Sequence, residues 1–372
     1  MYGRSTKGLL VFCFVWACGG SEGGELPPHG PVTFSDQALG FGEALAAAPG
    51  WLLVASPGAG KVEAFTESEA GWRVAPEFRL SPGLPQYGRS LALDGDWLAV
   101  AASRPSTPGS FEAIVELHRR NDRGWVHVET YTSSRGVGPE SLYGAALAIG
   151  SGQLAIGGPG GHVELINLAT PQAPRVVIEG LAADGFGEAL AIAGNQLFVG
   201  APRRHEGRGA VDLYDLKLAG PAWVELRPEP GHEEGFGQVL SAHGNLLAVG
   251  IPKASGDLDS LSTWPGAVEV FEATQSGWVR RPVEGLPPLA RQDELGSAVA
   301  VVGDRVLISA EGRNGKAGVV FGAQVEGGRA QIVAQFEAPA GSGARLGRAV
   351  ALSGKTAVLG APGRGQIEIW RW

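Results

Sequence analysis

A unit of about fifty residues recurs along almost the whole chain and is clearest at residues 186–214, FGEALAIAGNQLFVGAPRRHEGRGAVDLY. Two short apolar stretches flank Gly194-Asn195, a pair that suits a tight β-hairpin. A polar loop leads to a third stretch, 210–214, in which apolar and polar residues alternate as in a half-buried strand. No segment has the length or the periodicity of a helix, so the unit is predicted to be all-β.

Each copy of the unit opens with an aromatic residue or leucine followed by glycine. The seven pairs are Phe41-Gly42, Tyr87-Gly88, Tyr143-Gly144, Phe186-Gly187, Phe236-Gly237, Leu295-Gly296 and Leu346-Gly347. Three strands follow each pair, and a tryptophan marks a fourth strand in several copies. These tryptophans are Trp72, Trp125, Trp223 and Trp278. Repeated units of four antiparallel strands are typical of a β-propeller, so we expect seven four-stranded antiparallel blades.

The repeat resembles the FG-GAP family, whose members include the propellers of integrin alpha subunits and many bacterial envelope proteins. The family pattern is complete in the fourth copy, at Phe186, Gly187, Gly200, Ala201 and Pro202. The resemblance covers residues 31–372. Many family members carry an aspartate-rich calcium loop between the first two strands. Here that loop is only a pair such as Gly95-Asp96, so we carry over no metal site and expect no cofactor.

The last copy ends with its third strand, where the chain also ends. The short apolar segment PVTFS, residues 31–35, precedes the first copy. We expect this N-terminal segment to supply the fourth strand of the last blade, because such pairing removes two exposed strand edges.

The N-terminus has the features of a targeting segment. Residues 1–17 carry Arg4 and Lys7 before an apolar stretch that is too short to span a bilayer, so they are predicted to be a signal peptide. The sequence VWAC resembles a bacterial lipoprotein cleavage box, in which the cysteine becomes the acylated first residue. Cys18 is the predicted lipidation site, and residues 18–30 are a flexible tether. The alternative is an ordinary periplasmic or secreted protein.

Composition narrows the classes of partner and chemistry. The net charge is −8, which argues against nonspecific nucleic-acid binding, and no basic amphipathic stretch favours direct membrane contact. The two cysteines, Cys13 and Cys18, both lie at the N-terminus, so no disulfide framework is expected. The Gly-x-Ser-x-Gly match at residues 19–23 lies in the predicted tether and not between a strand and a helix, so no nucleophile elbow is expected, and no zinc-protease motif occurs. We expect a monomer that meets the membrane only through its lipid.

The loops between second and third strands should all emerge on one face of the ring. They are predicted to be long in copy two (102–111), copy four (203–209), copy five (253–266) and copy six (311–316). Function tends to reside on such loops. The candidate binding rim consists of Arg203, Arg204, His205, Arg208, Asp257, Asp259, Trp264, Arg313 and Lys316. The two aspartates lack the further ligands that calcium needs.

Two functions remain open. The first is a non-catalytic binding or scaffold propeller, lipid-anchored at the bacterial outer membrane, that recognises an envelope or extracellular protein or a polysaccharide through its loop face. The second is a propeller enzyme, a glycan lyase or hydrolase, with its site at the mouth of the central channel. The first predicts a channel lined by small residues, and the second predicts several ionisable groups close together there.

Overall fold

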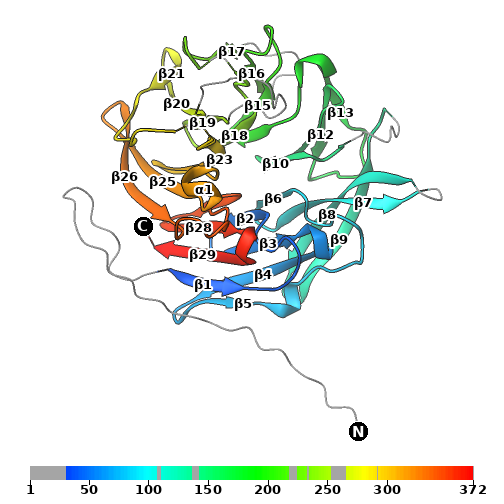
Figure 1. The fold of residues 1–372 in the computed structure, drawn as a ribbon. Coiled ribbons are helices and arrows are strands. Elements are labelled where there is room, and N and C mark those ends of the chain that lie inside the picture. Colours follow the sequence, from blue (N-terminus) through cyan, green and yellow to red (C-terminus); the bar gives the residue numbers. More distant parts are fainter. Residues whose placement is uncertain are drawn as a thin grey trace.

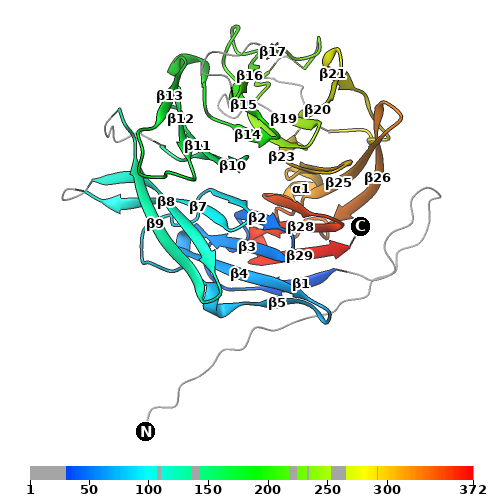
Figure 2. The ribbon, with the colours of Figure 1, turned by 180° about the vertical axis from the view of Figure 1, so that it is seen from behind.

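The computed structural model describes residues 31–106, 110–135, 142–217, 224–232, 234–252, 265–290 and 292–371. These residues form seven sheets arranged around a central axis, as Figure 1 shows from one side and Figure 2 from behind. The predicted all-β, seven-bladed β-propeller is therefore confirmed. The predicted signal peptide, the tether and Cys18 lie outside the described residues. Within the described part of the chain, no helix is long and apolar enough to cross a membrane.

The first four blades each contain four consecutive antiparallel strands. Blade 1 contains β2 (Ala44–Ala48), β3 (Trp51–Ser56), β4 (Lys61–Ser68) and β5 (Gly71–Val74). Blade 2 contains β6 (Leu91–Asp94), β7 (Trp97–Pro105), β8 (Phe111–Asn121) and β9 (Gly124–Thr132). Blade 3 contains β10 (Ala146–Gly150), β11 (Gln153–Gly157), β12 (His162–Asn167) and β13 (Val176–Glu179). Blade 4 contains β14 (Leu190–Ala193), β15 (Gln196–Ala201), β16 (Ala210–Asp215) and β17 (Val224–Leu226).

The remaining blades depart from this plan in two places. Blade 5 contains β18 (Val239–His243), β19 (Leu246–Ile251), β20 (Ala267–Thr274) and β21 (Gly277–Arg281). Blade 6 contains β23 (Leu295–Val302), β24 (Arg305–Ala310), β25 (Val319–Glu326) and β26 (Arg329–Glu337). The short strand β22 (Val283–Glu284) adds a parallel fifth strand beside β26. Blade 7 contains β27 (Val350–Ser353), β28 (Thr356–Ala361), β29 (Gln366–Arg371) and β1 (Val32–Ser35).

The ring closes between the two ends of the propeller, as predicted. Strand β1 pairs antiparallel with β29, and Val32 lies opposite Ile369. Both ribbon views show these two strands side by side. Trp372 lies outside the described residues. The closing pair satisfies backbone groups that would otherwise form an exposed edge in blade 7.

Apolar side chains gather between the blades. The described residues form seven buried clusters, and each cluster draws on two adjacent blades. The residue that opens each repeat lies in such a cluster and is at most 4% exposed. Phe41, for example, packs with side chains of blades 7 and 1. These residues therefore act as wedges between blades, where large apolar side chains contribute strongly to stability.

The glycine that follows each wedge allows neighbouring blades to approach closely. All seven of these glycines have φ between 79° and 91°, a range that L-residues rarely adopt. A Cβ at Gly237 would lie 2.5 Å from the carbonyl oxygen of Ala210 in the preceding blade. A Cβ at Gly200, in the Gly-Ala-Pro segment of blade 4, would overlap the carbonyl oxygen of Gly237. The Phe-Gly pair of one blade thus packs against the Gly-Ala-Pro glycine of the blade before it.

Two predicted connections between second and third strands differ from expectation. In copy two, residues 102–105 belong to a strand, because β7 continues to Pro105 and pairs there with Phe111 at the start of β8. In copy six, the connection contains the short element α1 (Arg313–Lys316), in which Asn314 and Gly315 have left-handed φ values. Short 3-10 turns follow β3 (η1, Pro57–Ala59), β5 (η2, Pro76–Phe78) and β28 (η4, Pro362–Arg364), and another (η3, Ala182–Asp184) lies before β14.

Candidate functional site

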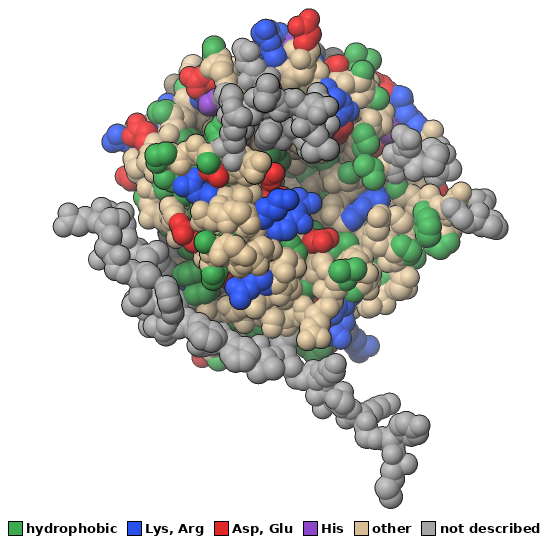
Figure 3. All heavy atoms as spheres, viewed as in Figure 1, with side chains coloured by type: hydrophobic (Ala, Val, Ile, Leu, Met, Phe, Trp, Pro, Cys, Tyr) green, Lys and Arg blue, Asp and Glu red, His purple; other side chains and the backbone are tan. Residues whose placement is uncertain are grey.

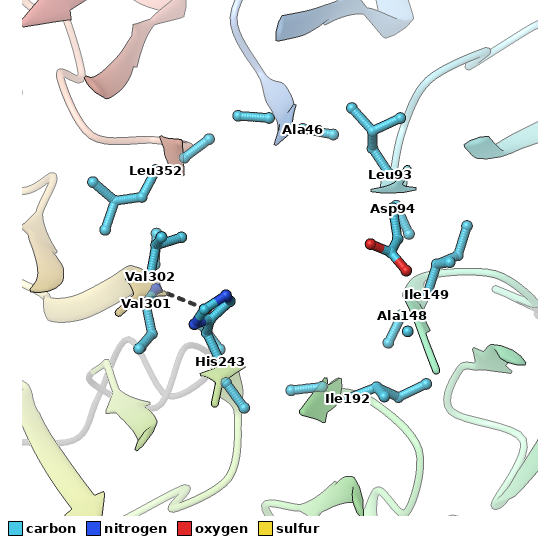
Figure 4. Close-up of a pocket in the computed structure, with 18 of the residues that line it drawn as sticks. Ala46, Leu93, Asp94, Ala148, Ile149, Ile192, His243, Val301, Val302 and Leu352 are labelled. Carbon is cyan, nitrogen blue, oxygen red and sulfur yellow. Dashed lines mark hydrogen bonds between the residues drawn. The ribbon is translucent and has the colours of Figure 1, made fainter. Parts of the chain in front are cut away.

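The innermost strands of all seven blades line a central channel of about 660 Å³. Its wall consists mainly of alanine and larger aliphatic side chains, including Ala46, Leu93, Ile149 and Ile192 (Figure 4). The small residues expected from the sequence therefore make up only part of the lining, since leucine, isoleucine and valine also face the channel. These side chains offer no chemistry beyond apolar contact.

Two ionisable side chains, Asp94 and His243, belong to the described lining of the channel. They come from blades 2 and 5 and extend into the channel from opposite walls (Figure 4). The Nδ1 atom of His243 accepts a hydrogen bond of 3.1 Å from the backbone N–H of Gly303. Among the described residues, no group of three or more His, Cys, Asp or Glu side chains is placed to hold a metal ion. On the described channel wall, the ionisable side chains of the lining are thus Asp94 and His243, which stand on opposite sides.

The predicted rim in blade 4 is largely tied to the blade itself. Arg203 pairs with Glu188 at 2.6 Å and donates hydrogen bonds to two backbone carbonyl groups. His205 lies 3.1 Å from a carboxylate oxygen of Glu225. Arg208 also has an interaction partner in the structure. The cationic loop predicted from the sequence thus contains residues with intramolecular contacts.

Arg204 is the most strongly held residue of that loop. Its guanidinium contacts Asp184 at 3.1 Å, Asp212 at 2.6 Å and Glu225 at 3.2 Å. Burial alone would lower the pKa of Arg204, but the three carboxylates outweigh it and raise that pKa. We infer that Arg204 is a structural ion-pair residue, because a partner that took its guanidinium would leave three carboxylates without their cation.

The rest of the predicted rim is described only in part. Asp257, Asp259 and Trp264 lie outside the described residues, as does Trp223. Arg313 pairs with Asp293 at 2.6 Å and donates a hydrogen bond to the carbonyl oxygen of Pro288. Lys316 is exposed, with a left-handed φ of 64°.

Blades 6 and 7 bring further charged residues together beside Lys316. Glu311 stands where other copies have the proline of Gly-Ala-Pro, and it is only 7% exposed. One of its carboxylate oxygens lies 3.3 Å from Arg345 and 3.3 Å from Arg348. The other oxygen is buried and has no hydrogen-bond partner in the structure. Figure 3 shows this face, where Lys and Arg side chains gather around the central hollow with acidic side chains between them.

Glu294 belongs to the same cluster. Burial and the nearby carboxylate of Glu311 raise the pKa of Glu294, while Lys316, Arg345 and Arg348 act in the opposite direction. The cluster contains three cationic side chains, Lys316, Arg345 and Arg348, and two carboxyl groups, Glu294 and Glu311, so cationic groups outnumber acidic ones. Lys316 was among the predicted rim residues, whereas Glu294, Glu311, Arg345 and Arg348 were not; three of these four lie outside the predicted loop 311–316.

A second set of charged residues was also missed. The third strand of every blade except blade 6 carries an acidic residue at one equivalent ladder position, where blade 6 has Phe321. The six acids are Glu63, Glu116, Glu164, Asp212, Glu269 and Glu368. The aligned stretches KVEAF, AIVEL, HVELI, AVDLY, AVEVF and QIEIW contain the signal that could have revealed them.

Most of these acids are bound to cations of their own blade. Glu164 contacts Arg175 at 2.5 Å, and Glu269 contacts Arg280 at 2.6 Å. In blade 3, the hydroxyl of Tyr143 also donates a hydrogen bond of 2.7 Å to Glu164. Burial raises the pKa of Tyr143, and the neighbouring carboxylate raises it further, so this hydroxyl stays a donor. These contacts join strands within a blade and favour a structural role over a catalytic one.

Comparisons with known proteins support the fold. No family model matches the chain, and no curated protein matches it. A chain in the crystal structure of a mitotic checkpoint complex is similar, with a TM-score of 0.59, 13% identity, and coverage of 96% of this chain and 98% of that chain. The Neurospora crassa Pan2 WD40 domain is similar with a TM-score of 0.55, 11% identity, and coverage of 90% and 89% respectively. At these identities the likeness shows the fold alone, a seven-bladed β-propeller that resembles WD40 structures.

Proposed function

We propose that the protein is a non-catalytic binding propeller that recognises a protein through its loop face. The observation that carries the proposal is the contrast between an aliphatic channel and a loop face that displays half-exposed cations. Arg345 and Arg348 keep 40% and 46% of their side-chain surface exposed while Glu311 holds both guanidiniums. Charged groups fixed in this way favour steering and orientation of a partner.

The similar structures agree with a binding role. One of them is described as a checkpoint complex and the other as a WD40 domain. A propeller scaffold hosts many functions, so this likeness supports the proposal only as an analogy. The enzyme alternative requires several ionisable groups close together at the channel, whereas the described wall carries Asp94 and His243 on opposite sides.

The repeat is proposed to be of the FG-GAP type. The support is physical: the glycine of a Gly-Ala-Pro segment, such as Gly200, meets the glycine of the next Phe-Gly pair, such as Gly237. Both members of the family pattern therefore serve a single contact between blades. This relation accounts for why the two glycine positions recur together along the chain.

The proposed location is the bacterial outer membrane, with the lipid on Cys18 as anchor. The support is the sequence VWAC after a short apolar segment. We expect Cys18→Ala to abolish incorporation of labelled fatty acid into the protein. Cys13→Ala is the matched control and should leave incorporation unchanged. Continued labelling of the Cys18→Ala protein would contradict the anchor.

A comparison of the two faces of the ring tests the binding role. A photo-crosslinking residue at Glu206, in the blade 4 loop, probes the loop face, and one at Lys355, in the β27–β28 hairpin, probes the opposite face. Both positions are exposed. In the full-length protein in its own envelope, we expect discrete crosslinked partners from position 206 and none from position 355. Equal adducts from both faces, or adducts from 355 alone, would refute the assignment of the loop face.

A further inference from the structure

The charged cluster between blades 6 and 7 stands on two loops that are fixed to each other. The backbone N–H of Gly341 donates to the carbonyl oxygen of Asn314 at 3.3 Å, and that of Arg345 donates to Lys316 at 3.0 Å. Leu346 adds a further backbone bond of 2.9 Å to Ala317. The loop before β27 therefore lies against the connection that contains α1, and the side chains of both loops share one platform.

Three cations of this platform face solvent around one buried acid. Arg345 and Arg348 both contact the same oxygen of Glu311, and each contact is 3.3 Å long. This length exceeds that of a strong charge-assisted hydrogen bond, so neither guanidinium is saturated. Lys316 is exposed beside them, and its positive charge acts on Glu294. The half-exposed guanidinium groups therefore keep donor capacity that solvent can reach.

The backbone at Arg345 supplies an independent argument. The residue before the wedge has a left-handed φ in six of the seven copies. These residues are Gly40, Gln86, Gly185, Gly235, Glu294 and Arg345. Glycine adopts this conformation without strain, whereas a side chain there is unfavourable. Strained residues of this kind tend to occur where the side chain is used for binding or switching.

Blade 7 differs from the other blades in a second position of the same turn. In blade 7, the residue after the glycine that follows the wedge is Arg348. The other copies have Glu43, Arg89, Ala145, Glu188, Gln238 and Ser297 at this position. The guanidinium of Arg89 is used internally, because it donates to the carbonyl oxygen of Tyr143. Blade 7 alone therefore carries arginine on both sides of its wedge and glycine. The pair adds local positive charge to a protein whose net charge is −8.

We propose that Lys316, Arg345 and Arg348 bind an acidic peptide segment of a partner protein. Planar guanidinium groups match the geometry of carboxylates, and a nearby ammonium can take a second carboxylate. The loops at 311–317 and 339–348 contain no aromatic residue on which a sugar ring could stack, which disfavours a uronic-acid glycan. This inference rests on the proposed binding function and names the chemistry of its ligand.

The test uses the full-length protein and a fluorescein-labelled hexaglutamate peptide, with binding followed by anisotropy. We expect binding that weakens as salt rises, because charge pairs at an exposed site are screened. Arg345→Gly and Arg348→Gln should each weaken binding about tenfold, as expected for loss of a charged hydrogen-bond donor. Arg345→Gly should also leave the thermal midpoint unchanged or raise it, since glycine relieves the left-handed backbone.

Gln86→Gly is the matched control, because Gln86 occupies the same backbone position in blade 2 with φ of 54°. It should leave hexaglutamate binding unchanged. Equal binding by wild type, Arg345→Gly and Arg348→Gln would overturn the proposal, and so would tighter binding of trigalacturonate than of hexaglutamate. If hexaglutamate fails while crosslinks at position 206 persist, the binding function stands and this ligand assignment falls.

Discussion

Blades 3 and 7 carry a glutamate at the same position of the third strand, but they surround it differently. Glu164 of blade 3 is fully buried and contacts Arg175 at 2.5 Å. Glu368 of blade 7 receives a 3.1 Å hydrogen bond from the indole N–H of Trp370. In the described structure, no ion pair forms at Glu368. The repeat therefore fixes the place of the acid, while the adjoining segment determines its partner.

The two carboxyl groups have opposite pKa shifts for this reason. Burial pushes the pKa of Glu164 up, but hydrogen bonds from Ser134, Tyr143 and Arg175 prevail and lower it. Burial raises the pKa of Glu368, and Trp370 and Arg364 offset only part of that rise. The fourth strand of blade 7 is β1, with the sequence VTFS, which brings no cation. Ring closure by the N-terminus thus leaves one acid of the set without an ionic partner.

The largest expected effect in this comparison comes from Glu164→Gln. The substitution leaves the guanidinium of Arg175 without its buried countercharge and should lower the free energy of unfolding by about 3 kcal/mol. Because the pKa of Glu164 is lowered by folding, its stabilising contribution is present above the unfolded-state pKa and disappears as the pH falls through the folded-state pKa. Urea unfolding of variant and wild type between pH 3 and pH 7 measures both effects.

The difference between the Glu164→Gln variant and wild type should therefore shrink as the pH falls. A difference that stays constant over this range would show that the ion pair contributes nothing to stability. In that case the acids of blades 3 and 7 would not differ in their contribution to stability.

A smaller effect of opposite sign is expected from Glu368→Gln. Glu368 is half-buried and has no ion pair in the described structure, which disfavours its charged form, so the amide should be as stable as wild type or more stable by about 1 kcal/mol near pH 7. The pKa of Glu368 is raised by folding, so the contribution of this group to wild-type stability is fully present below its unfolded-state pKa and is lost as the pH rises through its folded-state pKa. The stability gap between the Glu368→Gln variant and wild type should widen over that range in urea titrations.

Thr33→Arg sharpens the same comparison, because Thr33 lies opposite Glu368 in the ladder. A cation at this position should give Glu368 an ionic partner, as Arg175 gives Glu164 from the segment just before β13, and should reduce the loss of stability with rising pH. If Glu368→Gln instead destabilised the protein at every pH, the two acids would have the same role.

Much of the ring could be predicted from residues that recur in register. The wedge and glycine at Phe186-Gly187 and the hairpin at Gly194-Asn195 revealed the repeat, and PVTFS revealed its closure. The connection in copy two was predicted as a long loop over 102–111, a segment that contains Arg104 and Pro105. The structure instead extends β7 through them, since the partner residues Phe111 and Glu112 continue the ladder. Pairing across the sheet overrode local propensity there.

The candidate site was less accessible to prediction. Arg204 was expected to face a ligand, but three acids from different segments surround it. Glu311 was predicted only as part of the copy-six loop 311–316, and Arg345 and Arg348 were not selected. A charge count along one loop cannot show which neighbouring blade supplies the counterion. That information depends on contacts between residues far apart in sequence.

The sequence by itself determined the number of blades, the wedge and glycine positions between adjacent blades, and the pairing of the two chain ends. Each copy determines its own strands and turns, because the features that form them span only a few residues. These features are local hydrogen bonds, the alternation of side chains and the left-handed glycine turn. The tertiary structure alone decided which charges are neutralised and which remain available. Glu164, Glu368 and Arg345 occupy repeat positions, but their electrostatic environments come from other strands and loops, and electrostatic energy depends on distance and burial in three dimensions.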